Sequence, residues 1–265
     1  SLGNQTDVDK AVAAANVAFK SFSETSKSDR LDLLQELKSI TSRRINELAE
    51  AISIEMGAPM TMSREAQADA AIGHLDGFID ALTNMSFRDQ LSNGDVLVKE
   101  PIGVCGLITP WNWPINQITL KVIPALAAGC TMVLKPSEIA PLSGMLFAEI
   151  INEAGFPPGV FNLINGDGDG VGTDLSTHPQ VDMISFTGST RAGKLISKNA
   201  ADTVKRVCLE LGGKGGNIIF SDSHPEAVRE GVRNIMSNSG QSCDAPTRML
   251  VEKSIYERAV KEAAD

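Results

Sequence analysis

Hydrophobic residues recur at helical spacing through the first ninety positions of the chain. Apolar side chains lie three or four residues apart in four stretches, at 8–22, 33–40, 45–52 and 66–82. This spacing puts the apolar side chains of each stretch on one helical face. Gly57 follows the third stretch and ends it, because glycine readily adopts the backbone conformation that closes a helix. The pattern therefore predicts a helical N-terminal region.

The spacing of the apolar residues changes near Asn93-Gly94. Short β-branched runs on either side of Pro101 predict an extended arm over 94–109. Beyond it, short apolar runs alternate with helical patterns. Strands are predicted at 131–134, 160–164, 183–186, 204–211 and 217–220, and helices at 139–154, from 191 onwards and at 225–236. This alternation predicts an α/β fold, a parallel sheet with helices on both faces, whose ligands bind at the carboxyl ends of the strands.

Composition narrows the class of ligand. The chain carries 24 Lys and Arg against 33 Asp and Glu, a formal net charge of −9, and only 5% of its residues are aromatic. Such a balance argues against nucleic acid and anionic membranes as partners. No apolar run approaches the roughly 18 residues of a membrane span, and no export signal opens the chain. We expect a cytoplasmic protein that binds a small molecule. The chain starts without Met and stops within a helical pattern, so we also expect it to be incomplete.

The four cysteines fall into two groups. Cys105, Cys130 and Cys208 lie in apolar, β-branched surroundings, which predicts small buried side chains. Cys243 lies in a polar segment after Gly240, and such a thiol is either a candidate nucleophile or an idle surface cysteine. The three histidines show no metal-ligand spacing, so we expect no metal site.

Two turns after predicted strands carry candidate chemistry. In the segment 109–114, prolines flank Asn112 and hold its amide in one direction, as a donor to a developing oxyanion or simply as a turn residue. In the segment 135–138, Glu138 could accept both hydroxyls of an adenosine ribose, with Lys135 beside it. Its charge repels a 2′-phosphate and favours NAD over NADP. A solvated charge pair is the alternative.

One further turn and one strand carry candidate chemistry. Gly188 and Gly193 bracket a helix start that includes Ser189, an arrangement that can cradle a pyrophosphate. The pattern matches neither of the two common glycine-rich phosphate motifs. Glu210 stands in an otherwise apolar strand, which indicates either a general base of raised pKa or a buried structural ion pair.

Five signatures together resemble the aldehyde dehydrogenase superfamily, of the NAD(P)-dependent kind that does not acylate coenzyme A. They are PWNWP at 110–114, LKPSE at 134–138, FTGST at 186–190, LELGGK at 209–214 and GQSC at 240–243. The signatures follow the family's order and about its spacing, and the resemblance covers essentially the whole chain. It implies a Rossmann-like parallel sheet with helices on both faces, followed by the start of a second α/β catalytic domain.

The resemblance also implies roles and boundaries. Cys243 would be the nucleophile, Glu210 the general base, Asn112 the oxyanion donor and Lys121 a lysine near the proton-exit route. NAD would be held by residues of the matching motifs, namely Trp111, Lys135, Ser137, Glu138, Gly168, Gly188, Ser189, Gly193 and Leu211. Residues 1–210 would form the NAD-binding domain, with 94–109 as an oligomerisation arm, and 211–265 would begin the catalytic domain. The partners expected are a small-molecule aldehyde and further copies of the chain, in a homodimer or homotetramer.

Three departures qualify the resemblance. Gly215-Gly216 stand where the family usually has Ser-Pro, and Asp244 adds a negative charge that would raise the pKa of the neighbouring thiol unless it points away. The family continues for about another domain, so this chain alone is not expected to turn over. Two alternatives stay open, a non-catalytic NAD-binding module and a coenzyme A-acylating dehydrogenase. Glu210 argues against the latter, which has no use for a water-activating base.

Overall fold

A computed structural model describes residues 2–265. They divide into two compact units, with the boundary between Glu210 and Leu211. Over these residues no helix is both long and apolar enough to cross a membrane. The same residues contain no group of three or more His, Cys, Asp and Glu side chains that could hold a metal ion.

The N-terminal region of the first unit is helical, as the apolar spacing predicts. Its elements are α1 (Gln5–Phe22), α2 (Lys27–Arg43), α3 (Ile45–Met56), α4 (Met60–Met62) and α5 (Asp69–Asn84). A π-helical segment, η1 (Ser63–Ala68), joins α4 to α5. Gly57 ends α3 in the left-handed conformation, with φ of 75°. A glycine adopts this conformation without the steric cost that a side chain would add.

Five strands form the central sheet. They are β3 (Val104–Ile108), β4 (Thr131–Lys135), β5 (Phe161–Leu163), β6 (Met183–Gly188) and β7 (Arg206–Leu211), in the spatial order β5-β4-β3-β6-β7. Strand β3 pairs in parallel with β4 and β6, and β4 pairs in parallel with β5. The chain therefore builds outward from β3 to one side and then returns to build outward on the other. This order is typical of dinucleotide-binding sheets, and the predicted α/β fold is confirmed.

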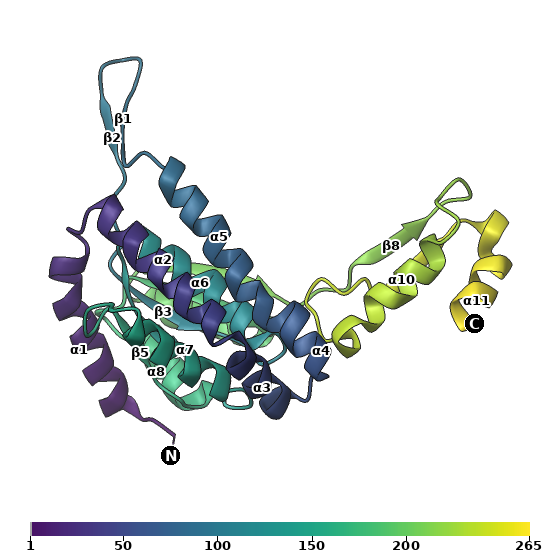
Figure 1. Cartoon of the computed structure of the whole chain (residues 1–265), viewed down its shortest axis with the longest axis horizontal. Coiled ribbons are helices and arrows are strands. Elements are labelled where there is room, and N and C mark those ends of the chain that lie inside the picture. The colour runs from purple at the N-terminus through teal and green to yellow at the C-terminus, as the bar shows by residue number, and fades with distance from the viewer. Residues whose placement is uncertain (1) are drawn as a thin grey trace. The chain divides into compact units, whose positions relative to one another are not determined.

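Helices cover both faces of this sheet (Figure 1). The connecting elements are α6 (Pro114–Ala128), α7 (Leu142–Glu153), the π-helical turn η2 (Gly168–Gly172), α8 (Thr173–Thr177) and α9 (Thr190–Ala201). Helices α6 and α7 pack on one face, with α2, α3 and α5 against them, while α1 contacts β3, β4 and β5 from the other. The main hydrophobic core is formed largely by residues of the sheet and of the helices α2, α3, α5, α6 and α7. Helix α6 is not among the predicted elements; its apolar residues follow the proline-rich turn directly.

The predicted arm is wrong in its extent. Only β1 (Arg88–Gln90) and β2 (Val96–Val98) form an antiparallel hairpin, which extends beyond the neighbouring helices (Figure 1). Residues 104–108, placed in the arm by the sequence, are instead the middle strand of the sheet and are buried throughout. A short β-branched run looks the same in an exposed ribbon as in a sheet, because its pattern does not record which strands will flank it.

The second unit begins at Leu211, which is also the last residue of β7. It contains the parallel strands β8 (Gly216–Ile219) and β9 (Arg248–Val251), with helices α10 (Ala227–Met236) and α11 (Tyr256–Ala264). Two 3-10 turns, η3 (Ser237–Gly240) and η4 (Lys253–Ile255), complete it. A small core of Ile219, Val228 and Ala259 joins one strand to both helices.

Two residues of β7 differ from the prediction in their burial. Cys208 and Glu210, predicted to be buried, are both exposed, whereas Cys105 and Cys130 are buried as predicted. The reason is that β7 is the last strand of the sheet, and its side chains alternate between exposed and half-buried. Glu210 therefore needs no buried counter-ion.

Candidate active site

The parallel strands bring the predicted turns to one edge of the sheet. Ile108 lies opposite both Lys135 and Phe186 in the strand register, so β3 and β4 end at the same level and β6 continues past it to Gly188. The turns that follow these strands contain Asn112, the Lys135 motif and Ser189. Their convergence at the carboxyl edge is the arrangement in which open α/β sheets bind ligands, especially where the chain changes direction between β3 and β6.

The turn after β3 holds Trp111 and Asn112, both half-buried, before Pro114 opens α6. Its backbone is tied to a distant helix, because Gln67 Nε2 donates a hydrogen bond of 3.2 Å to the carbonyl oxygen of Asn112. Gln67 is fully buried and lies in the π-helical segment η1. Such segments are frequent at functional sites. The sequence does not predict this role of Gln67, because its partner lies 45 residues further along the chain.

The turn after β4 is built on a buried lysine. Lys135 is 3% exposed, and its Nζ donates to the carbonyl oxygens of Pro136 at 2.7 Å and Gly166 at 2.8 Å. Glu138 Oε2 lies 3.4 Å from the same nitrogen, and its side chain is half exposed. Burial lowers the pKa of Lys135, although Glu138 opposes that shift. Ser137 is also buried, and its Oγ accepts the backbone N–H of Ile139.

The turn after β5 contains Gly168, the exposed first residue of η2. A Cβ at this position would meet no atom within 4 Å, so no packing constraint of this structure demands glycine there. Asp167 caps η2 by accepting the N–H of Gly170 at 2.6 Å. The bond of Lys135 to Gly166 joins this turn to the one after β4.

The turn after β6 begins α9. Ser189 is its N-cap, with Oγ accepting the N–H of Ala192 at 3.2 Å, which leaves the hydroxyl hydrogen able to donate. Gly193 is buried in the first turn of the helix. A Cβ on Gly188 would lie 2.5 Å from Cζ of Phe186, so any other residue here would force that ring to shift.

Two hydroxyl groups that the sequence did not single out lie at the same edge. Thr109 directly follows β3, and Thr187 is the residue of β6 next to Phe186. Both are buried, and within the described residues neither Oγ1 has a hydrogen-bond partner. A buried polar group without a hydrogen-bond partner is costly. A polar ligand that binds at the ends of β3 and β6 would supply hydrogen-bond partners for the two hydroxyl groups. This observation fits a dinucleotide, whose phosphates, hydroxyls and carboxamide are all hydrogen-bonding groups.

Strand β7 places Glu210 near Lys121 of α6. Lys121 is 8% exposed, and burial lowers its pKa while the nearby Cys208 and Glu210 act in the opposite direction. A buried ammonium and an exposed carboxylate on facing elements can exchange a proton through water. Leu211 ends the strand and is half-buried.

Cys243 belongs to the second unit and is exposed. It follows η3, where Asn238 and Ser239 both have positive φ, of 49° and 57°. Asn238 and Gln241 stabilise this turn reciprocally, since the side-chain amide of each donates to the backbone carbonyl of the other, at 3.2 and 3.0 Å. The carbonyl oxygen of Cys243 would lie 3.2 Å from a Cβ on Gly213, so the backbones of these two residues of the second unit lie close together.

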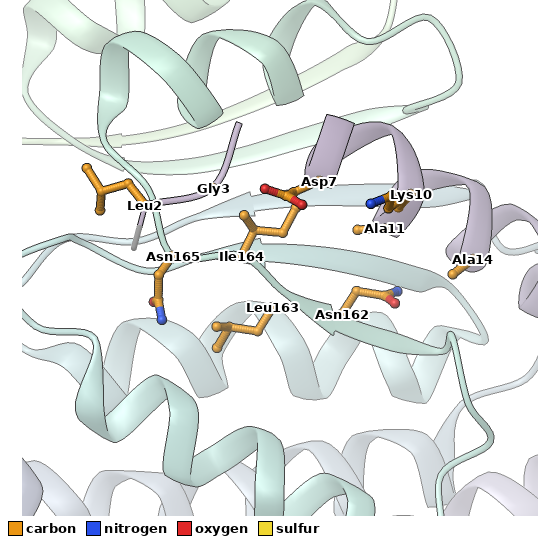
Figure 2. A pocket seen from close by; sticks show the side chains of 10 residues that line it. All are labelled: Leu2, Gly3, Asp7, Lys10, Ala11, Ala14, Asn162, Leu163, Ile164 and Asn165. Carbon is orange, nitrogen blue, oxygen red and sulfur yellow. The ribbon is translucent and has the colours of Figure 1, made fainter. Parts of the chain in front are cut away.

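A cavity of about 540 Å³ is lined by other residues. It is formed by α1 and the end of β5, and Figure 2 shows Asp7 and Lys10 of α1 beside the segment 162–165. None of the residues predicted from the motifs lines it.

Comparison with known proteins matches this architecture to one family. The sequence profile of the aldehyde dehydrogenase family matches residues 1–265. A curated relative, the 3-succinoylsemialdehyde-pyridine dehydrogenase of a Pseudomonas species, is 57% identical over 256 residues, which is 96% of this chain and 54% of that protein.

Two solved structures are similar throughout the chain. An aldehyde dehydrogenase from Bartonella henselae has a TM-score of 0.98 and 59% identity, over 99% of this chain and 56% of that one. A variant of aldehyde dehydrogenase C from Pseudomonas syringae, solved with NAD⁺ and octanal, has a TM-score of 0.98 and 49% identity, over 100% of this chain and 54% of that one. The chain thus spans about half the length of the relatives it matches.

Proposed function

The chain belongs to the aldehyde dehydrogenase family, and on that premise we propose that its protein oxidises an aldehyde to a carboxylic acid with NAD⁺ and water. The observation that carries the proposal is the carboxyl edge of the sheet, where three turns with nucleotide-binding character follow parallel strands in register. The relative solved with NAD⁺ and octanal supports both the cofactor and the class of substrate.

The cofactor site is proposed at this edge. Lys135 and Glu138 would hold the adenosine ribose, Trp111 and Ser189 the pyrophosphate, with Gly188 and Gly193 allowing close approach and Ser137, Gly168 and Leu211 completing the surroundings. Glu138 accepts hydrogen bonds from ribose hydroxyls and repels a 2′-phosphate, which favours NAD⁺ over NADP⁺. When bound, the nicotinamide ring supplies the acceptor for the hydride that leaves the substrate carbon.

Cys243 is assigned the role of nucleophile. Its thiolate forms a bond to the carbonyl carbon of the aldehyde, and the electron pair of the C=O bond moves to oxygen. The side-chain amide of Asn112 donates a hydrogen bond to this oxygen, where the negative charge develops. After loss of the hydride the substrate is held as a thioester on Cys243.

Glu210 is assigned the second half of the reaction. Its carboxylate takes a proton from water, the water oxygen bonds to the thioester carbon, and the C–S bond breaks to release the acid and the thiolate. Glu210 is exposed, which suits a base that must return its proton to solvent. Lys121 faces the same strand and is assigned to that return path.

The proposal extends to assembly and location. The β1-β2 hairpin exposes Val96, Leu97 and Val98, each more than 40% accessible, and this apolar edge suits pairing between copies in a homodimer or homotetramer. A cytoplasmic location is part of the proposal, and the net charge of −9 argues separately against affinity for nucleic acid or anionic membranes.

The test uses the protein at full length, with absorbance at 340 nm to follow NADH formation from octanal and NAD⁺. Cys243→Ala should abolish NADH formation. Glu210→Gln should give a burst of one NADH per site followed by turnover slowed about 100-fold or more, because the thioester persists. NADH formation by Cys243→Ala at the normal rate would refute the mechanism.

The same measurements separate the alternatives. A nucleotide-binding module without turnover is the second candidate, because the turns with nucleotide-binding character all lie at the carboxyl edge of the first unit's sheet. NAD⁺ binding by calorimetry with no NADH formed at full length would favour the module. A requirement for coenzyme A in place of water would favour an acylating enzyme.

A further inference from the structure

Two buried cysteines lie at the opposite edge of the sheet from the candidate site. Cys105 is the second residue of β3, and Cys130 directly precedes β4, so both lie at the amino ends of parallel strands. They are 4% and 3% exposed, and both line a cavity of about 490 Å³. The proposed reaction uses neither thiol.

A buried arginine adjoins this pair. Arg30 of α2 is 6% exposed, and within the described residues its Nε and Nη1 have no hydrogen-bond partner. Its guanidinium stacks over the ring of Phe87, 4.9 Å from the centroid, and occupies the space where a Cβ on Gly129 would be. Burying a charge without a counter-ion is costly. Of the residues described, the one whose charge acts on Arg30 is Cys130.

The surroundings of Cys130 favour its anionic form. The thiol of Cys105 and the backbone N–H groups of Ile102 and Gly103 hydrogen-bond to its sulfur, and together with Arg30 they lower the pKa of Cys130 to about 7. The same contact, with burial and the charge of Asp182, raises the pKa of Cys105. These contacts favour the anionic form of Cys130 and the neutral thiol of Cys105, which donates to it.

The cavity gives small reagents a path to both sulfurs. Its wall is mostly apolar, and its charged lining residues are Glu100, Lys121 and Arg206. Arg30 and Asp182 face the thiol pair from α2 and from the segment before β6. Hydrogen peroxide is close to water in size, so a cavity of this volume admits it.

We propose that Cys105 and Cys130 form an oxidative modification site, in which a hydroperoxide oxidises Cys130 and Cys105 closes a disulfide. The Cys130 thiolate attacks one peroxide oxygen, the O–O bond breaks, and the other oxygen leaves as water after taking a proton, which gives a sulfenic acid. The Cys105 sulfur then attacks the sulfenic sulfur, and the hydroxyl leaves with the Cys105 proton as a second water. The two electrons lost by the thiols reduce the peroxide.

In the test, the exposed thiols are removed in a Cys208→Ser/Cys243→Ser chain, and this chain is treated with hydrogen peroxide. Intact mass should fall by about 2 Da, the mass of two hydrogens. With Cys105→Ser added, Cys130 should instead gain about 16 Da, one oxygen, and react with a sulfenic-acid probe. With Cys130→Ser added, the matched control, Cys105 should stay reduced. Peptide mapping of the unsubstituted chain should find the same cross-link between 105 and 130, which keeps the test independent of how the variants fold.

The pH dependence provides a second readout. The oxidation rate should rise about tenfold from pH 6 to pH 8 and then level off, following the thiolate fraction of a group with a pKa of about 7. A rate still climbing steeply above pH 8 would indicate an ordinary thiol. That result, or no loss of 2 Da, or a stable gain of 16 Da on Cys130 while Cys105 is present, would overturn the proposal. Because the pair lies at the other edge of the sheet, oxidation should leave the affinity for NAD⁺ unchanged.

Discussion

The hydrogen bond from Gln67 to the Asn112 turn leads to a sharp prediction. Gln67→Leu keeps nearly the same buried volume, so the main changes are loss of the 3.2 Å bond from Nε2 to the Asn112 carbonyl and of the weaker 3.3 Å bond to Met56 Sδ. Losing a buried hydrogen bond costs about 1–2 kcal/mol. If the turn relaxes by that amount, the Asn112 amide is displaced from the oxyanion. Since 1.36 kcal/mol corresponds to a factor of ten in rate, kcat should fall about tenfold.

The assay compares this variant with Ser63→Ala. Ser63 is also fully buried in η1, but its Oγ donates to the carbonyl of Ala58, at 3.3 Å, and not to the Asn112 turn. Both variants should lower the free energy of urea unfolding by about 1–2 kcal/mol. Only Gln67→Leu should lower kcat for NADH formation at full length. Equal kcat losses in both variants, or a normal kcat in a folded Gln67→Leu protein, would refute the reasoning.

Three other substitutions test the sheet edge and the pH behaviour. Lys135→Met should weaken NAD⁺ binding at least tenfold by calorimetry, while Lys205→Met, which removes a buried lysine at the amino edge, should not. Gly188→Ala should lower the free energy of unfolding by about 1–3 kcal/mol, because its Cβ would overlap a phenylalanine ring, while Gly168→Ala, in open space, should change it little. Burial raises the pKa of Glu55, so the protonated side chain favours folding at low pH, and this stabilisation is lost as pH rises through the raised pKa. The stability of Glu55→Gln relative to the parent chain should therefore increase between pH 4 and pH 7 in urea titrations.

Much of the candidate site followed from local signals. Asn112, Lys135, Glu138 and Ser189 were each found at the end of a predicted strand, because prolines, glycines and charged residues interrupt apolar runs where a chain must turn. In the structure, the turns that contain these residues all lie at one edge of the sheet. Their roles in catalysis and cofactor binding stay predictions.

Other residues at the carboxyl edge of the sheet could not be identified from their neighbours in the sequence. The hydroxyls of Thr109 and Thr187 gain meaning only because β3 and β6 become neighbours although some eighty residues separate them. Gln67 reaches Asn112 across 45 positions of sequence, from a helix whose π-helical irregularity carries no clear periodic signature. No window of a dozen residues contains either pairing.

The linear order of residues was enough to establish an alternating α/β chain, its turns and their chemistry, because period and turn preference are local properties of the backbone. Burial was decided by strand order instead. Cys105 and Cys208 occupy similar β-branched runs, yet one is in the middle strand and buried, and the other is in the outermost strand and exposed. Whether a side chain meets water depends on which strands and helices flank it, and that is settled only when distant segments pack together.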